Sequence, residues 1–473
     1  MTASRAGRAL VVGAYERDNF GDLLFLLVTE KYLADAGLDV VATAPVAADM
    51  TDLLDRRVDG FVPRLEAERF DQVWTVGGEV GGTRVDTALW MSAPSATWRR
   101  YRAADAQEQA RLRRELIGGT EIESPYLPRM SAFPRNATTP AVLNSIGLAG
   151  ISGRDAGDRE KILRIVREAT SVSVRDRLSS DLLARHGIAH TLVPDVVHTV
   201  RLTHPRPDGE EGSGFALVQA ATRMLAKEGV ERFADALAAS EALAPFPVRL
   251  FAAGLAPNHD SLADYARIVE LVRAHDPQRD IAVLDTSRRP WELVDEIRRA
   301  RLWVGGSLHG RIVAAAYDVP RVSFAKRKLD TYARTWDPHM PYGTTADTLD
   351  DAVRRALDPR VVRASAGVGE RLAHLADRNV RAAVGAASTA TDAETAARRA
   401  AAADRAVVER DRRAREEAAQ LRRQVSALEA ARPSAREVLR ASVRARGLAL
   451  VSDVRRVGGG VARRVRGARL AHH

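Results

Sequence analysis

The chain has 473 residues, of which 45% are hydrophobic and 28% charged, and it contains no cysteine. This length exceeds one ordinary domain and predicts two or three, and the hydrophobic content excludes global disorder. Without cysteine there can be no disulfide, thiol nucleophile, iron–sulfur cluster or thiolate zinc site. Catalysis must therefore depend on histidine, arginine, lysine, carboxylates and hydroxyls.

The positive charge is concentrated near the C-terminus. Residues 432–473 hold eleven arginines and two carboxylates, a surplus of nine out of a formal net charge of +10. The remainder is nearly neutral, so the basic composition does not indicate what the body binds. No apolar run reaches the roughly 18 residues of a membrane span. The apolar stretch 9–15 breaks at once into charged residues, which favours a strand over a signal peptide, and we expect a cytoplasmic protein.

Strands and helices are predicted to alternate over residues 1–205, which we assign to an N-terminal α/β domain. The predicted strands are 9–13, 38–42, 72–76, 141–146, 171–174 and 190–193, and the predicted helices are 22–36, 158–170 and 177–186. Short apolar strands joined by helices are typical of a parallel sheet. Residues 83–140, with several aromatic residues and an arginine-rich helix, break the alternation and predict an insertion over that sheet.

A second α/β domain is predicted over 213–345, after a linker at 204–213 that is rich in Pro, Gly and acidic residues. Its predicted strands are 215–219, 247–252, 280–284, 301–304 and 320–324, and its helices are 229–239, 260–274, 291–299 and 308–317. The expected fold class is therefore α/β, with two Rossmann-like domains facing a cleft. In that architecture ligands bind at the carboxyl ends of the strands.

The remaining chain predicts helices. Residues 346–388 are expected to pack on the body and 389–432 to form a helical or coiled-coil segment. A short heptad seam in this segment consists of Ala414, Ala418, Leu421, Val425 and Leu428.

Residues 433–473 predict a basic amphipathic tail. We consider three kinds of binding partner for this tail. An anionic surface at the inner face of the membrane would attract it by about 1 kcal/mol per basic residue. The body or another subunit of a homo-oligomer is the second. Nucleic acid is the least favoured, because the tail has no aromatic residue to stack on bases.

Familiar signatures are absent from the sequence, which has no P-loop, dinucleotide-binding turn, zinc-protease motif or nucleophile elbow. His186 and His190 are four apart, but Gly187 separates them at a predicted helix end, so we expect no metal site. The remaining candidates are polar residues at strand ends.

The first candidates follow the strands over 9–13 and 72–76. Asn19 and Asp22 stand at the start of a predicted helix, where they cap it or leave its amides free to hold an anion. Gly77, Gly78 and Glu79 follow the other strand. A tight turn explains these glycines, and so does close approach of a ligand to the backbone.

Two further strand ends carry charged residues. Arg175 would point into the cleft or form an ion pair with an aspartate. His309 opens a helix after a glycine-rich turn. Because the helix dipole lowers the pKa of a histidine there unless an anion is bound, the position suits acid–base chemistry on an anionic ligand. Packing is the alternative role for His309, and an exposed turn is the alternative for Lys328.

Six groups of residues then occur in a fixed order. They are Asn19-Phe20-Gly21-Asp22, the glycine-rich turn after Val76, Asn144-Ser145-Ile146-Gly147, Val174-Arg175-Asp176 with Ser179, Val193-Pro194-Asp195, and Gly306-Ser307-Leu308-His309-Gly310 with Val319-Pro320 and Lys328. In these motifs the chain resembles the polysaccharide pyruvyl transferase family over roughly residues 8 to 340. The resemblance implies a GT-B-like fold and transfer of pyruvate from phosphoenolpyruvate to two hydroxyls of a sugar, which forms a cyclic ketal and releases phosphate.

The resemblance also implies roles for individual residues. The acid that protonates the enol carbon is expected to be His309, by the resemblance and by its position. The carboxylates that we consider, on chemical grounds, as the base for the sugar hydroxyl are Asp22 and Asp195. The donor-binding set is Gly77, Gly78, Arg175, Ser307, Leu308, Arg311 and Lys328, and the acceptor side is Asn19, Glu79 and Asp195. Cationic side chains in the donor set suit a phosphate and a carboxylate. We expect no cofactor beyond the donor substrate, and as acceptor a glycan or lipid-linked glycan of an exopolysaccharide or the cell envelope.

Two departures from the family pattern keep other functions open. Ser307 stands where the family usually has Arg, a position that Arg311 one helical turn later could fill, and Glu79 stands where it usually has Gly. The alternatives are a nucleotide-sugar glycosyltransferase of the same architecture and a catalytically degenerate assembly protein.

Overall fold

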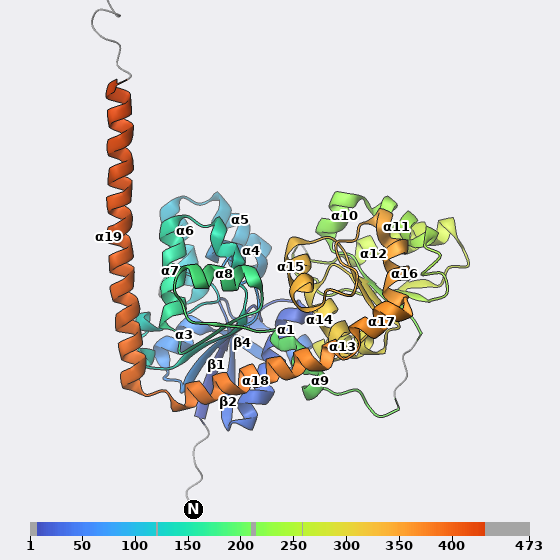
Figure 1. Cartoon of the computed structure of the whole chain (residues 1–473), viewed down its shortest axis with the longest axis horizontal. Coiled ribbons are helices and arrows are strands. Elements are labelled where there is room, and N and C mark those ends of the chain that lie inside the picture. Colours follow the sequence, from blue (N-terminus) through green and yellow to red (C-terminus); the bar gives the residue numbers. More distant parts are fainter. Residues whose placement is uncertain (1–6, 120–121, 210–213, 258, 431–473) are drawn as a thin grey trace, which may run out of the picture. The chain divides into compact units, whose positions relative to one another are not determined.

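The computed structural model describes residues 7–119, 122–209, 214–257 and 259–430 (Figure 1). Of these residues, those up to Ala406 belong to one compact unit, and residues 407–430 belong to a second. The tail predicted over 433–473 lies outside the described residues.

The first sheet has eight strands in the order β3-β4-β2-β1-β5-β6-β7-β8. Their bounds are β1 (Gly7–Val12), β2 (Leu38–Ala44), β3 (Ala48–Asp49), β4 (Arg57–Gly60), β5 (Gln72–Val76), β6 (Ala141–Ile146), β7 (Ser171–Val174) and β8 (Thr191–Leu192). All neighbours are parallel except β3 and β4. The predicted strands are therefore present, and β3 and β4, too short to show a period, are additions.

Helices of this domain connect the parallel strands. They are α1 (Phe20–Asp35), α2 (Thr51–Leu54), α3 (Phe61–Ala67), α7 (Ala156–Glu168), α8 (Arg177–Arg185) and α9 (Val200–Thr203), with 3₁₀ turns η3 (Ala149–Gly153) and η4 (Val196–Thr199). Between β5 and β6, where an insertion was expected, lie α4 (Val85–Ser92), α5 (Ser95–Ala103), α6 (Ala106–Ile117), η1 (Met130–Ala132) and η2 (Pro134–Asn136).

The second sheet is entirely parallel, in the order β11-β10-β9-β12-β13. Its strands are β9 (Ala216–Gln219), β10 (Val248–Leu250), β11 (Ile281–Val283), β12 (Leu302–Gly305) and β13 (Arg321–Ser323). Its helices are α10 (Thr222–Glu228), α11 (Val230–Ala239), α12 (Leu262–His275), α13 (Pro290–Arg299), α14 (Leu308–Ala316) and α15 (Arg327–Trp336). Two sheets of this kind confirm the predicted pair of Rossmann-like α/β domains.

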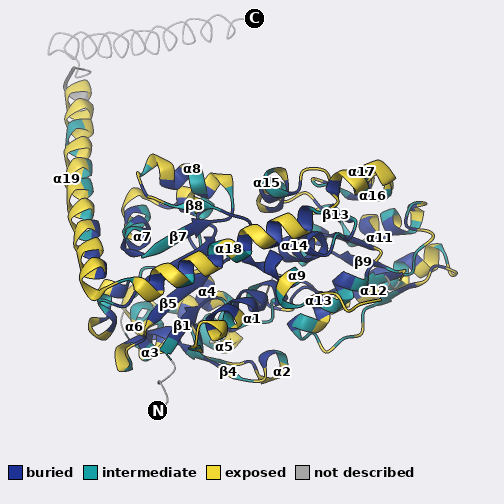
Figure 2. Ribbon diagram, turned by 60° about the horizontal axis from the view of Figure 1, so that its bottom comes forward, coloured by how far each residue is buried: buried dark blue, intermediate teal, exposed yellow. Residues whose placement is uncertain are grey.

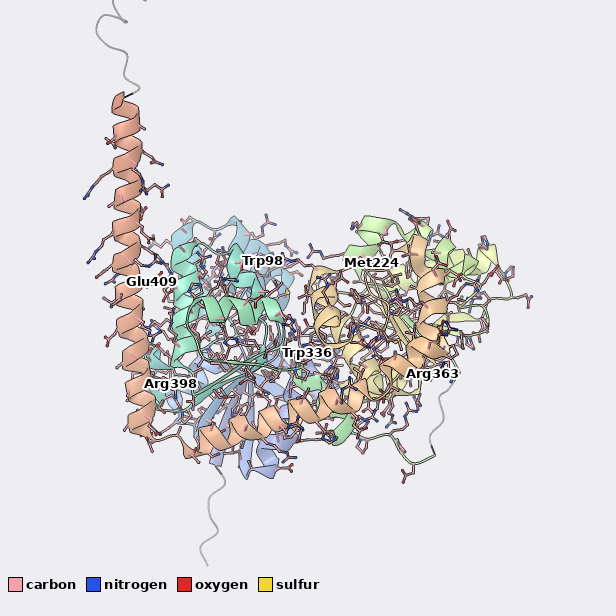
Figure 3. All side chains as sticks on the ribbon, in the orientation of Figure 1. Trp98, Met224, Trp336, Arg363, Arg398 and Glu409 are labelled. Carbon is pink, nitrogen blue, oxygen red and sulfur yellow. The ribbon has the colours of Figure 1, made fainter. Side chains whose placement is uncertain are left out.

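The two domains share a continuous hydrophobic core. One cluster of buried side chains joins α1 and η4 of the first domain to α13, α14 and α15 of the second. Helix α14 is buried over its whole length (Figure 2). Polar contacts cross the same interface. Arg288 donates to both carboxylate oxygens of Asp18 at 2.6 and 2.8 Å. The indole of Trp336, which is labelled in Figure 3, donates to the Arg175 carbonyl at 2.8 Å. The loops at this interface are therefore held by both domains.

Helices follow the second sheet, as predicted. They are η5 (Ala346–Thr348), α16 (Leu349–Leu357), α17 (Pro359–Ser365), α18 (Val368–Thr389) and α19 (Asp392–Ala430). Helix α18 returns to the first domain, where Asn379 donates to the side chains of Asn144 at 2.7 Å and Ser173 at 3.0 Å. None of the described helices combines the length and apolar composition that crossing a membrane requires.

Candidate functional site

The candidate site lies where the strand order of each sheet changes direction. In the first sheet this point is between β1 and β5, and in the second it is between β9 and β12. Crevices at such switch points, outside the carboxyl ends of the strands, are where open α/β sheets bind ligands. Most of the predicted site residues follow β1, β5 and β12, so the topology brings them to the switch points. Arg175, Asp195 and Lys328 follow β7, β8 and β13 instead.

The loop after β1 is fixed by a cap at the start of α1. The side chain of Asn19 accepts from the Gly21 amide at 3.2 Å and donates to Asp22 Oδ2 at 2.9 Å. Arg17 also donates to Asp22 Oδ2, at 3.2 Å. Asn19 is thus the helix cap, one of its two predicted roles, and Asp22 keeps one carboxylate oxygen outside these bonds.

The glycine turn after β5 is required by packing. Gly77 has a φ of +60°, and a Cβ there would lie 2.0 Å from the ring of Phe25. Only glycine therefore fits at this position. The Glu79 carboxylate accepts from the amides of Gly82 at 3.3 Å and Gly150 at 3.1 Å. It therefore ties two backbone segments together, which gives it a structural role in the loop.

His309 reaches across the domain interface to the start of α1. Its ring packs edge-on against Phe25, with centroids 4.8 Å apart, and a Cβ on Gly21 would come within 1.8 Å of Nδ1. The imidazole is buried, and Nε2 has no hydrogen-bond partner among the described residues. A buried polar atom without a partner is costly, so this nitrogen is a strong candidate for a ligand contact.

Arg175, Asp195 and His309 form a buried row. Arg175 Nη1 donates to Asp195 Oδ2 at 2.6 Å, and the same oxygen lies 3.9 Å from His309 Nε2. The other carboxylate oxygen accepts from the Val197 amide at 3.0 Å, and the Asp195 amide donates to the Tyr332 hydroxyl at 3.0 Å. Arg175 therefore takes part in the ion pair that was one of its two predicted roles, and it does so beside His309.

The electrostatics of this row favour an anion. Burial lowers the pKa of His309 well below its usual value, and the positive charges of Arg175, Lys328 and Lys326 lower it further. The side chain of Lys328 is exposed, but surrounding protein and the charges of Arg175 and Lys326 lower its pKa to about 8. A bound anion would offset these cations and favour protonation of His309.

A family model described as polysaccharide pyruvyl transferase matches residues 82–326. The chain belongs to the polysaccharide pyruvyl transferase family.

The solved structures to which the chain is similar include two epimerases and a glycosyltransferase. A putative UDP-N-acetylglucosamine 2-epimerase from Listeria monocytogenes is 12% identical, with a TM-score of 0.46 over 80% of this chain and 94% of that one. The UDP-GlcNAc 2-epimerase from Neisseria meningitidis, bound to UDP-GlcNAc, is 10% identical, with a TM-score of 0.44 over 78% and 98%. The glycosyltransferase SnogD from Streptomyces nogalater is 14% identical, with a TM-score of 0.39 over 81% and 100%. No curated protein sequence matches the chain.

In this pyruvyl transferase family member, Arg311 does not face the site, contrary to the prediction that it replaces the missing arginine at 307. Its guanidinium is fully buried on the far side of α14, where it pairs with Asp337 at 2.7 Å and donates to Ser323 Oγ at 2.9 Å. Four helix positions place Arg311 one turn further into the domain interior, so it supports the second domain. Ser307 caps α14 by accepting from the Gly310 amide at 3.2 Å, and the Leu308 side chain is buried in the shared core.

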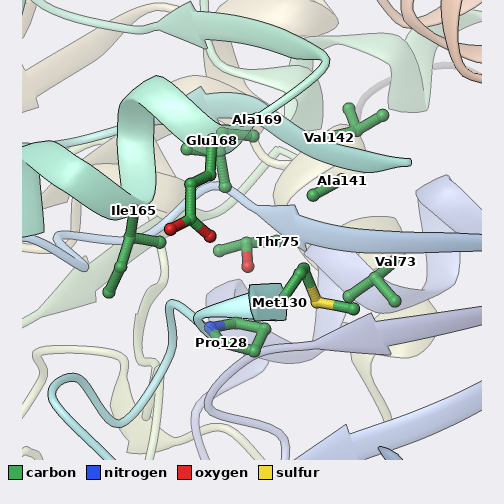
Figure 4. A pocket seen from close by; sticks show the side chains of 10 residues that line it. Val73, Thr75, Pro128, Met130, Ala141, Val142, Ile165, Glu168 and Ala169 are labelled. Carbon is green, nitrogen blue, oxygen red and sulfur yellow. The ribbon is translucent and has the colours of Figure 1, made fainter. Parts of the chain in front are cut away.

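Two cavities in the described part of the chain differ in size and in access to solvent. The first, of about 10 Å³, lies inside the first domain between β5, β6 and Met130 (Figure 4). It holds at most one water and is not a substrate site. The second, of about 530 Å³, is open to solvent and is lined by Leu178 of α8 and by residues at and near α15. The described residues contain no group of three His, Asp or Glu that could hold a metal ion.

Several residues of the site were not predicted. Arg17 holds Asp22, and Gln219, at the end of β9, accepts from the Gly306 amide at 2.8 Å and donates to Asp260 at 2.7 Å. Burial raises the pKa of Asp260 to about 6. Gln219 could have been found as a polar residue ending an apolar strand. Asp260 follows no strand directly, so its sequence context gave no signal.

Proposed function

We propose that the protein transfers pyruvate from phosphoenolpyruvate to two hydroxyls of a sugar, forming a cyclic ketal and releasing phosphate. The observation that supports this most is His309 Nε2, which is buried without a partner and lies among the positive charges of Arg175, Lys326 and Lys328. Phosphoenolpyruvate brings a phosphate and a carboxylate, which such cations bind. An acid among them can give a proton to the enol carbon.

Binding of the donor would itself prepare His309 for this step. Without a ligand, burial and the cations keep the imidazole neutral. The donor's negative charges offset those cations, raise the pKa of His309 and allow it to carry the proton that C3 of the donor receives. The acid is then charged only in the complex.

Asp22 is the proposed base. Its side chain is 14% exposed and accepts from Arg17 and Asn19, whereas that of Asp195 is fully buried in its ion pair with Arg175. As the first sugar oxygen bonds to C2, its proton passes to Asp22. The second oxygen then bonds to C2 as the C2–O bond to phosphate breaks. The two sugar hydroxyls together release two protons. These match the proton that C3 receives and the proton that the phosphate carries away.

The acceptor we propose is a glycan or lipid-linked glycan of an exopolysaccharide or the cell envelope. The eleven arginines from 432 onward would hold the enzyme at an anionic membrane surface, at the cytoplasmic face, where such an acceptor is presented.

Calorimetric titration of phosphoenolpyruvate tests the donor. We expect saturable binding by the wild-type protein, weakened about tenfold or more in Lys328→Met through loss of a charged contact, and retained in His309→Ala. Lys161→Met, at an exposed lysine of α7, is the matched control. Arg175→Lys preserves the charge beside Asp195 and avoids leaving a buried carboxylate unpaired.

Absence of saturable binding by the wild-type protein would overturn the proposed donor. Nucleotide sugars titrated in parallel then separate the alternatives, because their binding indicates a glycosyltransferase and their failure to bind indicates an assembly role.

A further inference from the structure

Lys326 stands at the end of a strand that adjoins the one carrying His309. In the second sheet β13 pairs with β12 in parallel, with Ser323 opposite Gly305. The segments that follow these strands, Gly306 to His309 and Phe324 to Lys328, therefore leave the same edge of the sheet side by side. Lys326 is the residue before α15, and its side chain is exposed and lines the open pocket of about 530 Å³.

Among the described residues, Lys326 and Lys328 are the cations near His309 that no carboxylate pairs with at ion-pair distance. The charge of Asp260 acts on Lys326, and those of Asp22 and Glu79 act on Lys328, from further away. Arg175 is neutralised by Asp195 at 2.6 Å, and Arg311 is held by Asp337 at 2.7 Å. In the described part of the chain no carboxylate lies within ion-pair distance of either lysine. Both lysines nevertheless act electrostatically on His309. A donor with two anionic groups needs more than one free cation, and these two lysines supply the charge.

We propose that Lys326 binds the phosphate group of the donor at the edge of this pocket, in the role that the sequence assigned to Arg311. This inference rests on the proposed function. The pocket is open and basic, lined also by Arg327 and Arg334 with Asp330 as its carboxylate, which suits a group that must leave as free phosphate. A flexible lysine is a suitable partner there because its ammonium is a mobile point charge that can follow the departing group.

The test compares three variants by calorimetry with phosphoenolpyruvate and by competition with inorganic phosphate and with pyruvate. Lys326→Met should weaken phosphoenolpyruvate and inorganic phosphate binding about tenfold or more, which is the loss expected for one charged hydrogen bond, and leave pyruvate competition unchanged. Lys326→Arg should restore affinity to within about threefold. Lys227→Met, at an exposed lysine of α10 that does not line this pocket, is the matched control, with little expected change.

Equal affinity of the wild-type protein and Lys326→Met for phosphoenolpyruvate would overturn the assignment of Lys326 while leaving the donor intact. An equal loss in Lys227→Met would also overturn it, because the effect would then come from the loss of any positive charge and not from a contact of Lys326. If the wild-type protein itself binds no phosphoenolpyruvate, the proposed function fails instead.

Discussion

The imidazole of His309 lies directly against Gly21, so that a Cβ at Gly21 would come within 1.8 Å of His309 Nδ1. One domain thus sets the position of the other domain's candidate acid. The glycine in the loop after β1 is explained by this contact, since Gly21 does not have a positive φ.

Gly21→Ala should therefore displace His309 and lower turnover at least tenfold, even though alanine is the better helix former by about 1 kcal/mol. Overpacking of this kind costs about 1–3 kcal/mol. Turnover and thermal unfolding would be measured together. Gly385→Ala is the control, because Gly385 is an exposed residue of α18 with open space around it, and this variant should be slightly more stable and fully active. Full activity of Gly21→Ala would show that the position of His309 does not matter.

Arg311→Ala should reduce stability before it affects the donor. The buried guanidinium makes bonds to Ser323, Pro341, Asp337 and Met340, and removing one partner of a buried ion pair costs about 3–5 kcal/mol. Chemical denaturation gives the loss of unfolding free energy. Arg311→Lys, assayed for phosphoenolpyruvate binding at a temperature where it is folded, should bind like the wild-type protein. A tenfold loss of affinity in that folded variant would restore Arg311 to the donor site.

The sequence predicted that the site residues follow strand ends, but it did not predict which charged side chains lack an ion-pair partner. Asn19, Asp22, Gly77, Arg175 and His309 could be found because each follows an apolar strand at a sheet edge. The orientation of the Arg311 side chain could not be predicted in this way. Packing decides whether an arginine one turn into a helix points to solvent or to the interior, and sequence spacing does not encode that packing.

The sequence predicted that Arg175 could pair with an aspartate, but not which aspartate. The ion pair between Arg175 and Asp195 joins residues 20 apart through the end of β7 and the start of η4, so its formation depends on tertiary structure. The role proposed for Lys326 also depends on tertiary structure, because it follows from the register in which β12 pairs with β13.

The buried side chain of His198 should make the folded protein less stable in acid. Burial lowers its pKa to about 3 from an unfolded value near 6.5, so the unfolded state binds one more proton than the native state between these pH values. Stability should therefore fall as pH decreases from about 6.5 toward 3, by up to about 1.4 kcal/mol per pH unit from this group. His198→Gln keeps an acceptor for the Tyr332 hydroxyl, which lies 3.0 Å from His198 Nε2, and should lose this slope. His374→Gln, at an exposed residue, should keep it. If the stability of all three proteins fell with pH at the same rate, His198 would not be the group responsible for the loss.

The heptad seam of α19 stays a prediction, and its apolar residues Leu421 and Val425 are 54% and 51% exposed in the single chain. Exposed apolar residues at heptad spacing favour pairing with a second copy. Light scattering of the full chain should show a concentration-dependent dimer, and Leu421→Glu with Val425→Glu should make it monomeric. A wild-type protein that is monomeric at all concentrations would exclude the coiled coil.

The most direct test of the account is an NMR titration of the His309 ring with and without phosphoenolpyruvate, assigned by comparison with His309→Ala. Burial and the neighbouring cations predict a pKa below 6.5 in the free protein, and a donor that offsets those cations should raise it by about one unit or more. A pKa that does not move at saturating phosphoenolpyruvate would contradict the role of His309 as an acid charged by its own substrate.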